Sequence, residues 1–494
     1  MDKKILRGAF IVTLGIILSK GLSLFFIFPF SKMVGSVGLA LYTYAYTPFL
    51  LFLETSTLGI PLAVNKLVSK YPDKEGEINY FSFRTIMCLS VISFVMLNLF
   101  SNVFAKYALG TGAVNTLSSV RITIFIISLS LFTAPLLSLV RCYFQGKKRF
   151  FLSSLSQVIE QGVRVSFILI FGYILIYKYN QTYEKAVYVA IFSTFISSLF
   201  ALLFLYLFYR KRKYNKASKS ISKEVLLTAL PFLLSGLNIT IYNIIDSLTY
   251  NNALYTYGLE NPEYYYGIYS FEINRLICIP LSLAIGLSIS LLPNLVEKKD
   301  KKLVSLSFRF LLLILIPVTF FSMAFSNEIY GLFYNHYDIG GNILFNYAPL
   351  IIMMGLQTLD HMVLQGLNRG KLLCISILIG IIIKGTTNYY FIINFGYNGA
   401  ILSSFLALLI SFLFSIFFNY KEIDLKVLFK DIFKILIKSF VCVWVILFIK
   451  QFFTPEDDKL SLFLYLCFFS IFYFILYYFI SKKMIKEVTN NNHH

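Results

Sequence analysis

Apolar runs of about 20 residues recur from one end of the chain to the other, and each is long enough to cross a ~30 Å hydrocarbon core as a helix. This feature restricts the fold more than any other. The 494 residues are 58% hydrophobic and only 14% charged, so the chain lacks the polar residues that water-soluble domains carry on their outer faces. It has to use lipid as its solvent, and we predict an all-α polytopic membrane protein.

The hydrophobic pattern predicts fourteen membrane spans, which divide into two sets of six and a final pair. Their approximate ranges are 9–31, 38–62, 80–105, 117–140, 152–177, 186–209, 225–250, 267–292, 305–330, 343–366, 372–394, 398–419, 428–449 and 460–480.

The net charge of +20 is placed in a way that favours membrane topology over nucleic-acid binding. With the N-terminus assigned to the cytoplasm, about 32 of the 44 Lys and Arg residues fall on the cytoplasmic side and about 7 fall outside. We therefore predict that both termini are cytoplasmic and that the chain has no nucleic-acid partner. The cytoplasmic basic residues include Lys3, Lys4, Arg7, Arg141, Lys147 to Arg149, Arg210 to Lys223, Lys298 to Lys302, Lys482, Lys483 and Lys486.

The longest hydrophilic stretch, 210–223, is expected to be a cytoplasmic linker between two lobes. The lobes show a weak internal repeat, because FQGKKR at 144–149 and LQGLNR at 364–369 each follow a long span. Two six-helix bundles in the same orientation predict a substrate site near the membrane midplane, with access that alternates as the bundles rock. The predicted segments are an N-lobe at 1–215, a C-lobe at 216–420, and two final helices with a tail at 421–494.

Ionisable side chains inside a bilayer are costly, so those within the predicted spans are functional candidates by default. Glu160 with Arg164 (i, i+4) and Glu272 with Arg275 (i, i+3) are spaced to neutralise each other on one helix face. A structural ion pair is favoured for the first pair and a functional role for Arg275. The other ionisable residues within spans are Lys20, Glu54, Asp246, Asp360, His361 and Lys384.

Asp246, Lys384 and Asn388 are expected to form a polar cluster in the second lobe, with Asp360 as a candidate fourth member. Two interpretations remain open. The acidic group binds a sodium ion or a proton, or Lys384 neutralises it as a structural ion pair; the second is favoured.

Four segments together resemble a known family. They are GLALYTYAYTPFLLFLETSTLGIPLAVNKLVSKY (38–71), IIDSLTYNNAL (244–254), INRLICIPLSLAIGLSISLLP (273–293) and VLQGLNRGKLLCISILIGIIIK (363–384). These segments resemble the MurJ-like flippases of Gram-positive bacteria, the YtgP and SpoVB group of the MATE-like multidrug/oligosaccharidyl-lipid/polysaccharide superfamily. The resemblance implies two six-helix lobes in a V, with two further helices that form a groove for a lipid tail. It also implies movement of lipid II, an undecaprenyl-pyrophosphate disaccharide-pentapeptide, from the inner to the outer leaflet.

A pyrophosphate cargo needs cations that bind it and then release it. By the resemblance, Lys20 matches a cavity Arg of helix one, and Arg275 matches an Arg of helix eight. The chain departs from the family where Phe26, Phe52 and Leu53 stand at other basic positions, so its cavity is less basic. The candidate substrate-binding residues are Lys20, Glu54, Arg164, Glu272, Asn274 and Arg275.

The family also implies a sodium site, formed by an Asp in helix seven and by an Asn and an Asp in helix eleven. Asp246 matches the first position, whereas the two others read Lys384 and Asn388. Asp246 and Asn388 are therefore the candidate cation site, in which the Lys384 ammonium can stand in place of the ion. We expect no cofactor, and coupling to Na⁺, H⁺ or the membrane potential.

Catalytic motifs are absent from the sequence, which has no Walker A pattern, Rossmann glycines, HExxH or nucleophile elbow. A membrane-bound polyprenyl-glycan polymerase or ligase would need a sizeable outer loop, whereas the longest predicted one, 251–266, has only about 16 residues. We therefore predict that the chain is not an enzyme.

Two other transport functions remain open. One is a flippase for another polyprenyl-linked glycan, such as one needed for spore cortex, capsule or teichoic acid. The other is a MATE-type drug/cation antiporter, which Glu54 and Asp246 permit but the quoted segments do not favour. In each case we expect a multi-pass monomer in the bacterial cytoplasmic membrane, in contact with membrane lipids.

Overall fold

The computed structural model describes residues 3–209, 218–278, 280–282, 301–334, 337–367, 369–419, 425–453 and 458–490. These residues form helices and no strand. Within these ranges, eleven helical stretches are long and apolar enough to cross a membrane. Two of them, Phe26–Lys70 and Gly370–Phe418, each include residues of two predicted spans. The eleven stretches therefore account for thirteen of the fourteen predicted spans. The predicted eighth span, 267–292, runs into residues outside the described ranges.

Packing divides the chain into two compact units. Unit 1 comprises Met1–Glu272 and Lys384–Ala400, and unit 2 comprises Ile273–Ile383 and Ile401–His494. One long helix, α16 (Gly370–Phe395), begins in unit 2 and ends in unit 1. The predicted lobes were defined by the order of the spans along the chain, whereas the two units are defined by packing. The division into lobes therefore stays a prediction. Most of the expected linker lies outside the described residues.

The helices of unit 1 include both membrane-crossing helices and short connecting ones. In chain order they are α1 (Lys3–Thr57), α2 (Ile60–Lys70), α3 (Glu75–Leu99), α4 (Ser101–Leu109), α5 (Leu117–Ser128), α6 (Ala134–Gly146), α7 (Phe150–Tyr173), α8 (Tyr183–Leu207), α9 (Lys219–Tyr257) and α10 (Pro262–Gly267), followed by the end of α16. Short 3₁₀ or π segments adjoin them at Pro72–Lys74, Leu129–Phe132, Ile174–Lys178, Ile268–Ile273 and Gly396–Asn398.

Backbone breaks in unit 1 occur where residues adopt left-handed φ angles. Gly35 (φ 64°) separates two helical segments within α1, so this one element holds the first two predicted spans. Leu58 (φ 50°) and Gly59 (φ 67°) end α1 and allow α2 to begin. A Cβ on Gly59 would lie 2.4 Å from the Ala229 carbonyl oxygen of α9, so the close approach of these helices requires glycine.

Polar caps begin two other helices of unit 1. Thr116 Oγ1 accepts a hydrogen bond from the Ser119 amide, and Ser119 Oγ accepts one from the Thr116 amide, which is a complete capping box at the start of α5. At the start of α9, Ser218 Oγ accepts a hydrogen bond from the Ile221 amide. These bonds satisfy amide groups that the first helical turn leaves without partners.

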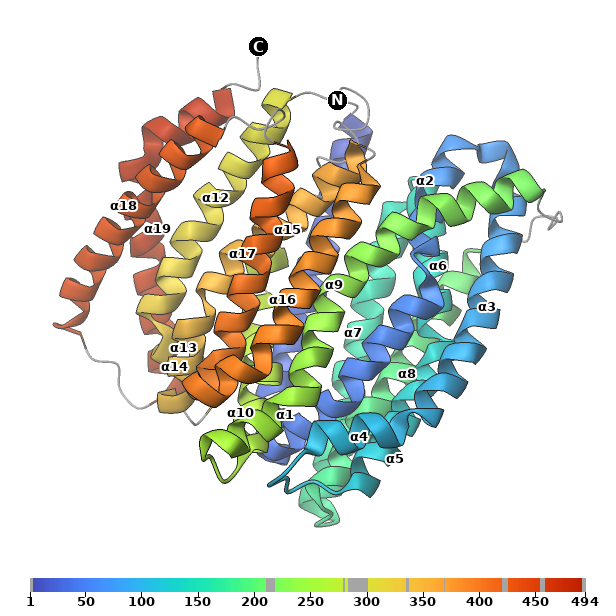
Figure 1. Cartoon of the computed structure of the whole chain (residues 1–494), viewed down its shortest axis with the longest axis horizontal. Coiled ribbons are helices and arrows are strands. Elements are labelled where there is room, and N and C mark those ends of the chain that lie inside the picture. The colour runs from blue at the N-terminus through green and yellow to red at the C-terminus, as the bar shows by residue number, and fades with distance from the viewer. Residues whose placement is uncertain are drawn as a thin grey trace. The chain divides into compact units, whose positions relative to one another are not determined.

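Buried apolar side chains from α2, α3, α6, α8 and α9 form one core in unit 1. This core includes Val64, Ile86, Leu139, Leu205 and Ala229. Nearby, α7 and α8 run side by side (Figure 1). The unit therefore presents α6, α7 and α8 as one packed group, which carries the charged cluster described below.

Unit 2 contains α12 (Lys301–Ala324), α13 (Ser326–Phe333), α14 (Tyr337–Tyr347), α15 (Pro349–Gly366), the start of α16, α17 (Gly399–Asn419), α18 (Leu425–Lys450) and α19 (Lys459–Asn490). Two ion pairs attach α18 to its neighbours. Arg309 of α12 pairs with Asp431, and Lys450 Nζ lies 2.6 Å from Glu328 Oε1 of α13. Because α19 also packs against α12, α13 and α18, the last two long helices belong to the packed body of this unit.

Large apolar side chains cover the outer surfaces of both units. Leu207 is 79% exposed in unit 1, and Phe417 is 71% exposed in unit 2. A water-soluble protein would bury groups of this size, whereas lipid tails solvate them. The chain is a multi-pass membrane protein.

Candidate functional site

A polar stripe runs along one face of α7. Ser153, Ser156, Glu160 and Arg164 are spaced by three or four residues, and residues at this spacing share a helix face. The opposite face carries exposed apolar side chains such as Phe151. Most of α7 is apolar, so this stripe is the part of the helix that needs polar partners.

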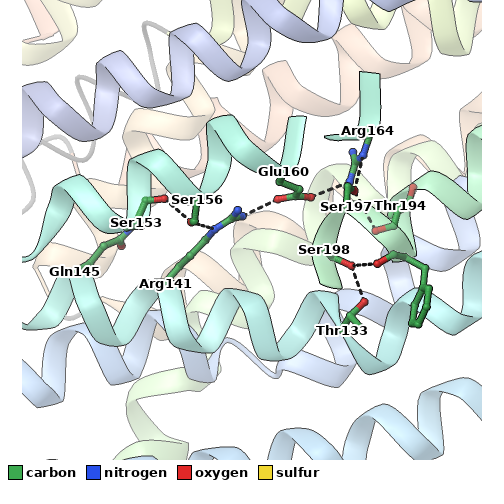
Figure 2. Close-up of polar contacts among 11 residues, drawn as sticks. Thr133, Arg141, Gln145, Ser153, Ser156, Glu160, Arg164, Thr194, Ser197 and Ser198 are labelled. Carbon is green, nitrogen blue, oxygen red and sulfur yellow. Dashed lines mark hydrogen bonds and ion pairs between the residues drawn. The ribbon is translucent and has the colours of Figure 1, made fainter. Parts of the chain in front are cut away.

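Arg141 of α6 joins Glu160 and Arg164 in an ion-pair cluster (Figure 2). Arg141 Nη1 lies 2.9 Å from Glu160 Oε2, and Arg164 Nη2 lies 2.8 Å from Glu160 Oε1. The three side chains are only 13–14% exposed. Two guanidinium groups share one carboxylate, so the cluster carries one surplus positive charge.

Hydroxyl groups hold both guanidinium groups in place. Arg141 Nε donates to Ser156 Oγ at 2.8 Å, and Arg164 Nε donates to Ser197 Oγ of α8 at 3.4 Å. The line of contacts continues along α7 towards the α6–α7 connection, where Gln145 Nε2 donates to Ser153 Oγ at 2.8 Å (Figure 2). The two arginines are therefore fixed from both sides, by the shared carboxylate and by serines.

Each guanidinium group keeps one terminal nitrogen that donates to no described residue. These nitrogens are Arg141 Nη2, which is buried, and Arg164 Nη1. Gln157 Oε1, on the same face of α7, is likewise buried without a hydrogen-bond partner among the described residues. Buried polar groups of folded proteins are usually paired, so such groups mark a place where a water or a ligand fits.

A second charged cluster lies elsewhere in unit 1, around Lys384. This side chain is fully buried, and its Nζ lies 2.7 Å from Asp246 Oδ1 of α9. The same nitrogen donates to Asn388 Oδ1 at 2.9 Å and to the Ala400 carbonyl at 3.0 Å. Tyr269 Oη donates to Asp246 Oδ2 at 2.8 Å.

The oxygens around Lys384 are those that a hard cation would choose, namely a carboxylate, an amide and a backbone carbonyl. The ammonium nitrogen stands between Asp246 and Asn388, the two residues predicted to hold a cation. The residues present therefore do not fit an additional metal ion at this position. Among the described residues no group of three or more His, Cys, Asp or Glu side chains is arranged to hold a metal.

The other predicted site residues are placed less completely. The backbone of Lys20 is part of α1, but its side chain is outside the described part of the structure. Glu272 is buried at the end of unit 1, and the half-buried Arg275 belongs to unit 2. Asn274 Oδ1 accepts a hydrogen bond from Tyr347 Oη at 3.2 Å within unit 2.

Glu54 is half-buried near the end of α1, facing α9. A Cβ on Gly236 would lie 2.6 Å from Glu54 Oε2, so the carboxylate rests directly against that glycine. No hydrogen bond or ion pair of this carboxylate occurs within the described ranges. Asp360, the candidate fourth member of the Lys384 cluster, belongs to unit 2 and hydrogen bonds with Ser415.

A third polar group joins the end of α9 and α10 to the α4–α5 connection. Glu263 Oε2 accepts hydrogen bonds from the amides of Val114 at 2.7 Å and Asn115 at 2.9 Å. Asn252 Oδ1 accepts from the Thr111 amide at 2.9 Å. Burial raises the pKa of Glu263, and the amide hydrogen bonds from Asn115 and Val114 oppose that shift. Segments far apart in the sequence are tied together here.

Sequence reasoning found the Glu160–Arg164 pair, and the structure confirms that contact. It missed Arg141, which was assigned to the cytoplasmic surface because it lies just beyond the predicted span 117–140. The helical segment in fact extends to Gly146, and the guanidinium group turns to α7. Tyr269 and the Ala400 carbonyl were also missed. Every residue has a backbone carbonyl, so the sequence does not show which one will accept a hydrogen bond.

Comparisons with known proteins agree on one family. The sequence profile of the polysaccharide biosynthesis protein family matches residues 5–299. Lipid II flippase MurJ of Bacillus subtilis (strain 168) is 32% identical over 446 residues, which are 84% of this chain and 82% of that protein.

Solved structures show the same fold. Lipid II flippase MurJ in an inward closed conformation superposes with a TM-score of 0.72 at 17% identity, over 96% of this chain and 99% of that one. An inward-facing multidrug resistance MATE family transporter superposes with a TM-score of 0.63 at 16% identity, over 83% and 95% of the two chains. At these identities the likeness concerns the fold alone. It confirms the predicted all-α, MATE-like fold.

Proposed function

This chain belongs to the polysaccharide biosynthesis protein family, and from that premise we propose that it carries lipid II from the inner to the outer leaflet of a bacterial cytoplasmic membrane. Like the flippase and the transporters to which it is similar, it is a transport protein and not an enzyme. Lipid II is the cargo named for the relative that is similar over 84% of this chain. That similarity is the observation on which the proposal rests.

The chemistry of the interior suits an anionic cargo. A diphosphate needs cationic groups in the membrane, because an unpaired charge there is costly. Unit 1 provides one surplus positive charge in the Arg141–Glu160–Arg164 cluster. We assign the diphosphate contacts to Lys20 and Arg275, the cationic positions to which the family resemblance points.

The coupling force in this proposal is the membrane potential or a proton, without sodium at Asp246. Lys384 already supplies a fixed positive charge to that carboxylate, which supports sodium independence. Glu54 is the candidate proton carrier, because its carboxylate is half-buried within a span and makes no ion pair with a described residue. A cation moved down a potential of 100 mV releases about 2.3 kcal/mol per charge.

Alternating access in this proposal uses the breaks inside the long helices. Gly35 and the Leu58–Gly59 pair interrupt regular helix geometry in unit 1, and Pro231 lies inside α9, where it cannot donate a backbone hydrogen bond. Such breaks are where membrane helices bend. The rocking of two bundles about a site near the midplane would flip a headgroup without exposing it to the lipid tails.

The decisive experiment asks whether lipid II reaches the outer leaflet. Cells in which this protein is the sole flippase are treated with an external lipid II-cleaving toxin, before and after depletion of the protein. Loss of cleavage on depletion is the expected result. Undiminished cleavage would exclude lipid II as the cargo and direct attention to another polyprenyl-linked glycan.

A matched pair of variants links that readout to the cavity. Arg275→Ala is expected to abolish growth of the depleted strain at an unchanged protein level, whereas Arg84→Ala removes an exposed arginine of α3 and is expected to leave growth intact. Full growth of the first variant would remove Arg275 from the cargo site.

A further inference from the structure

The charges of the Arg141–Glu160–Arg164 cluster do not balance within the described part of the chain. Both arginines form ion pairs with Glu160 and with no other described carboxylate. All three residues lie within stretches able to cross a membrane. A surplus guanidinium charge at such a position calls for a compensating anion or for water.

The free hydrogen-bonding groups of the cluster point to a ligand with several acceptor oxygens. Arg141 uses Nε and Nη1, and Arg164 uses Nε and Nη2, so each retains one terminal NH₂ group for another partner. A phosphate group presents several oxygens and accepts from two guanidinium groups at once.

The half-buried part of the polar stripe gives access to this position. The stripe starts at Gln145 and Ser153, beside the basic α6–α7 connection, and follows α7 for about 16 Å at a rise of ~1.5 Å per residue. Ser153 and Ser156 are buried, whereas residues 157–165 of α7 are half-buried throughout, so the part of the stripe that carries Glu160 and Arg164 is not sealed into a core. A lipid headgroup can therefore reach the charged part of the stripe, whereas the two buried serines hold Arg141 and Gln145 in place.

We propose that Arg141 and Arg164 form a binding site for a phosphate group carried by a membrane lipid. In this site the two free guanidinium nitrogens hold the phosphate oxygens, and Glu160 keeps both arginines in position. Glu160 also limits the affinity, because its carboxylate competes with the phosphate for the same cations. Such a site can bind its ligand and release it again, as a site that is occupied only transiently during transport requires. The inference does not depend on which glycan is transported.

Four variants separate binding from a purely structural ion pair. Arg141→Gln and Arg164→Gln each leave Glu160 paired with the remaining arginine, so both are expected to fold. Glu160→Gln raises the cluster charge, and Arg164→Lys keeps the charge but loses the planar fork. Arg84→Gln is the matched control, because it removes an exposed arginine outside the cluster.

The measurement is lipid binding to the full-length protein in phosphatidylcholine nanodiscs, by native mass spectrometry and by the ligand-induced rise in melting temperature. The probes are undecaprenyl diphosphate and phosphatidylglycerol. For at least one of them, Arg141→Gln and Arg164→Gln are expected to weaken binding about tenfold or more relative to the Arg84→Gln control. Arg164→Lys should fall in between, and Glu160→Gln should bind more tightly.

The outcomes discriminate among the sources of the phosphate and test the site itself. Arginine-dependent binding of undecaprenyl diphosphate alone assigns the site to a polyprenyl-linked ligand, and arginine-dependent binding of phosphatidylglycerol assigns it to bulk lipid; both support the proposal. Equal binding by Arg164→Gln and the Arg84→Gln control, or no binding of either lipid, overturns it. If Glu160→Gln lowers the stability without raising the affinity for either lipid, the role of Glu160 is that of a structural ion-pair partner. That result also overturns the proposal. The toxin experiment can fail while this binding succeeds, so the two conclusions are separable.

Discussion

Lys384 Nζ lies 2.7 Å from Asp246 Oδ1, and the lysine side chain is completely buried in unit 1. The covalent attachment of this cation to α16 means that it cannot leave during a transport cycle as a bound ion can. Its oxygen partners include Asp246 of α9, Asn388 of α16 and the Ala400 carbonyl. This relationship leads to two predictions about ion dependence and stability.

The melting temperature of the purified protein is expected to be the same in sodium chloride and in choline chloride at equal ionic strength. Lys384 occupies the position between Asp246 and Asn388, so sodium has no place to bind there. Lys384→Asn removes the ammonium group and adds an amide oxygen, and this variant should gain sodium-specific stabilisation. A sodium-specific rise in the unmodified protein would contradict the assignment.

Lys384→Met is expected to lower the free energy of unfolding by about 3–5 kcal/mol, because it leaves the buried Asp246 without its charge partner. The double variant Asp246→Asn with Lys384→Met should recover a large part of that loss, since neither charge remains. Equilibrium unfolding in mixed detergent micelles measures the double-mutant cycle. Additive losses would show that the two residues do not depend on each other.

Glu263 gives a pH dependence with a definite sign. Burial raises its pKa in the folded protein above the ordinary value of 4.5, against the opposing effect of the Asn115 and Val114 amides. The folded state therefore holds this proton more tightly than the unfolded state. The associated stability is fully present below about pH 4.5 and is lost as the pH rises through the folded-state pKa.

The measurement for Glu263 is the melting temperature as a function of pH, compared between the natural protein and Glu263→Gln. The natural protein should lose stability relative to the variant as the pH rises from 4.5, because the glutamine does not ionise. Parallel curves would mean that this carboxyl group has the same pKa in both states.

Gly59→Ala is expected to destabilise the protein by about 1–3 kcal/mol, because the new methyl group would lie 2.4 Å from the Ala229 carbonyl oxygen. Gly162→Ala is the matched control, since nothing lies within 4 Å of its Cβ position in α7. That control should be neutral or stabilising by up to about 1 kcal/mol, as helix propensity predicts. Equal melting temperatures for the two variants would argue against tight packing of Gly59 on α9.

The predicted spans illustrate which parts of this fold are local. Each is written in about 20 consecutive residues, so composition within a short window suffices to find it. The Glu160–Arg164 contact is equally local, because an i, i+4 spacing places both side chains on the same helix face. The Glu263 contacts are different in kind. Two backbone amides of the α4–α5 connection bind this carboxylate. Every residue except proline has such an amide, so the residue types near Val114 do not predict the contact.

The sequence by itself determined the solvent of this protein, its helical class and the residues that bring charge into the membrane. Hydrophobicity and helical periodicity act over a few turns and need no knowledge of distant segments. Only the tertiary structure decided that Arg141 shares Glu160 with Arg164, and that Ala400 offers its carbonyl to Lys384. These partners belong to different helices. Which side chains neutralise one another in a low-dielectric interior depends on how the helices pack, and that packing is not encoded in the spacing of any one of them.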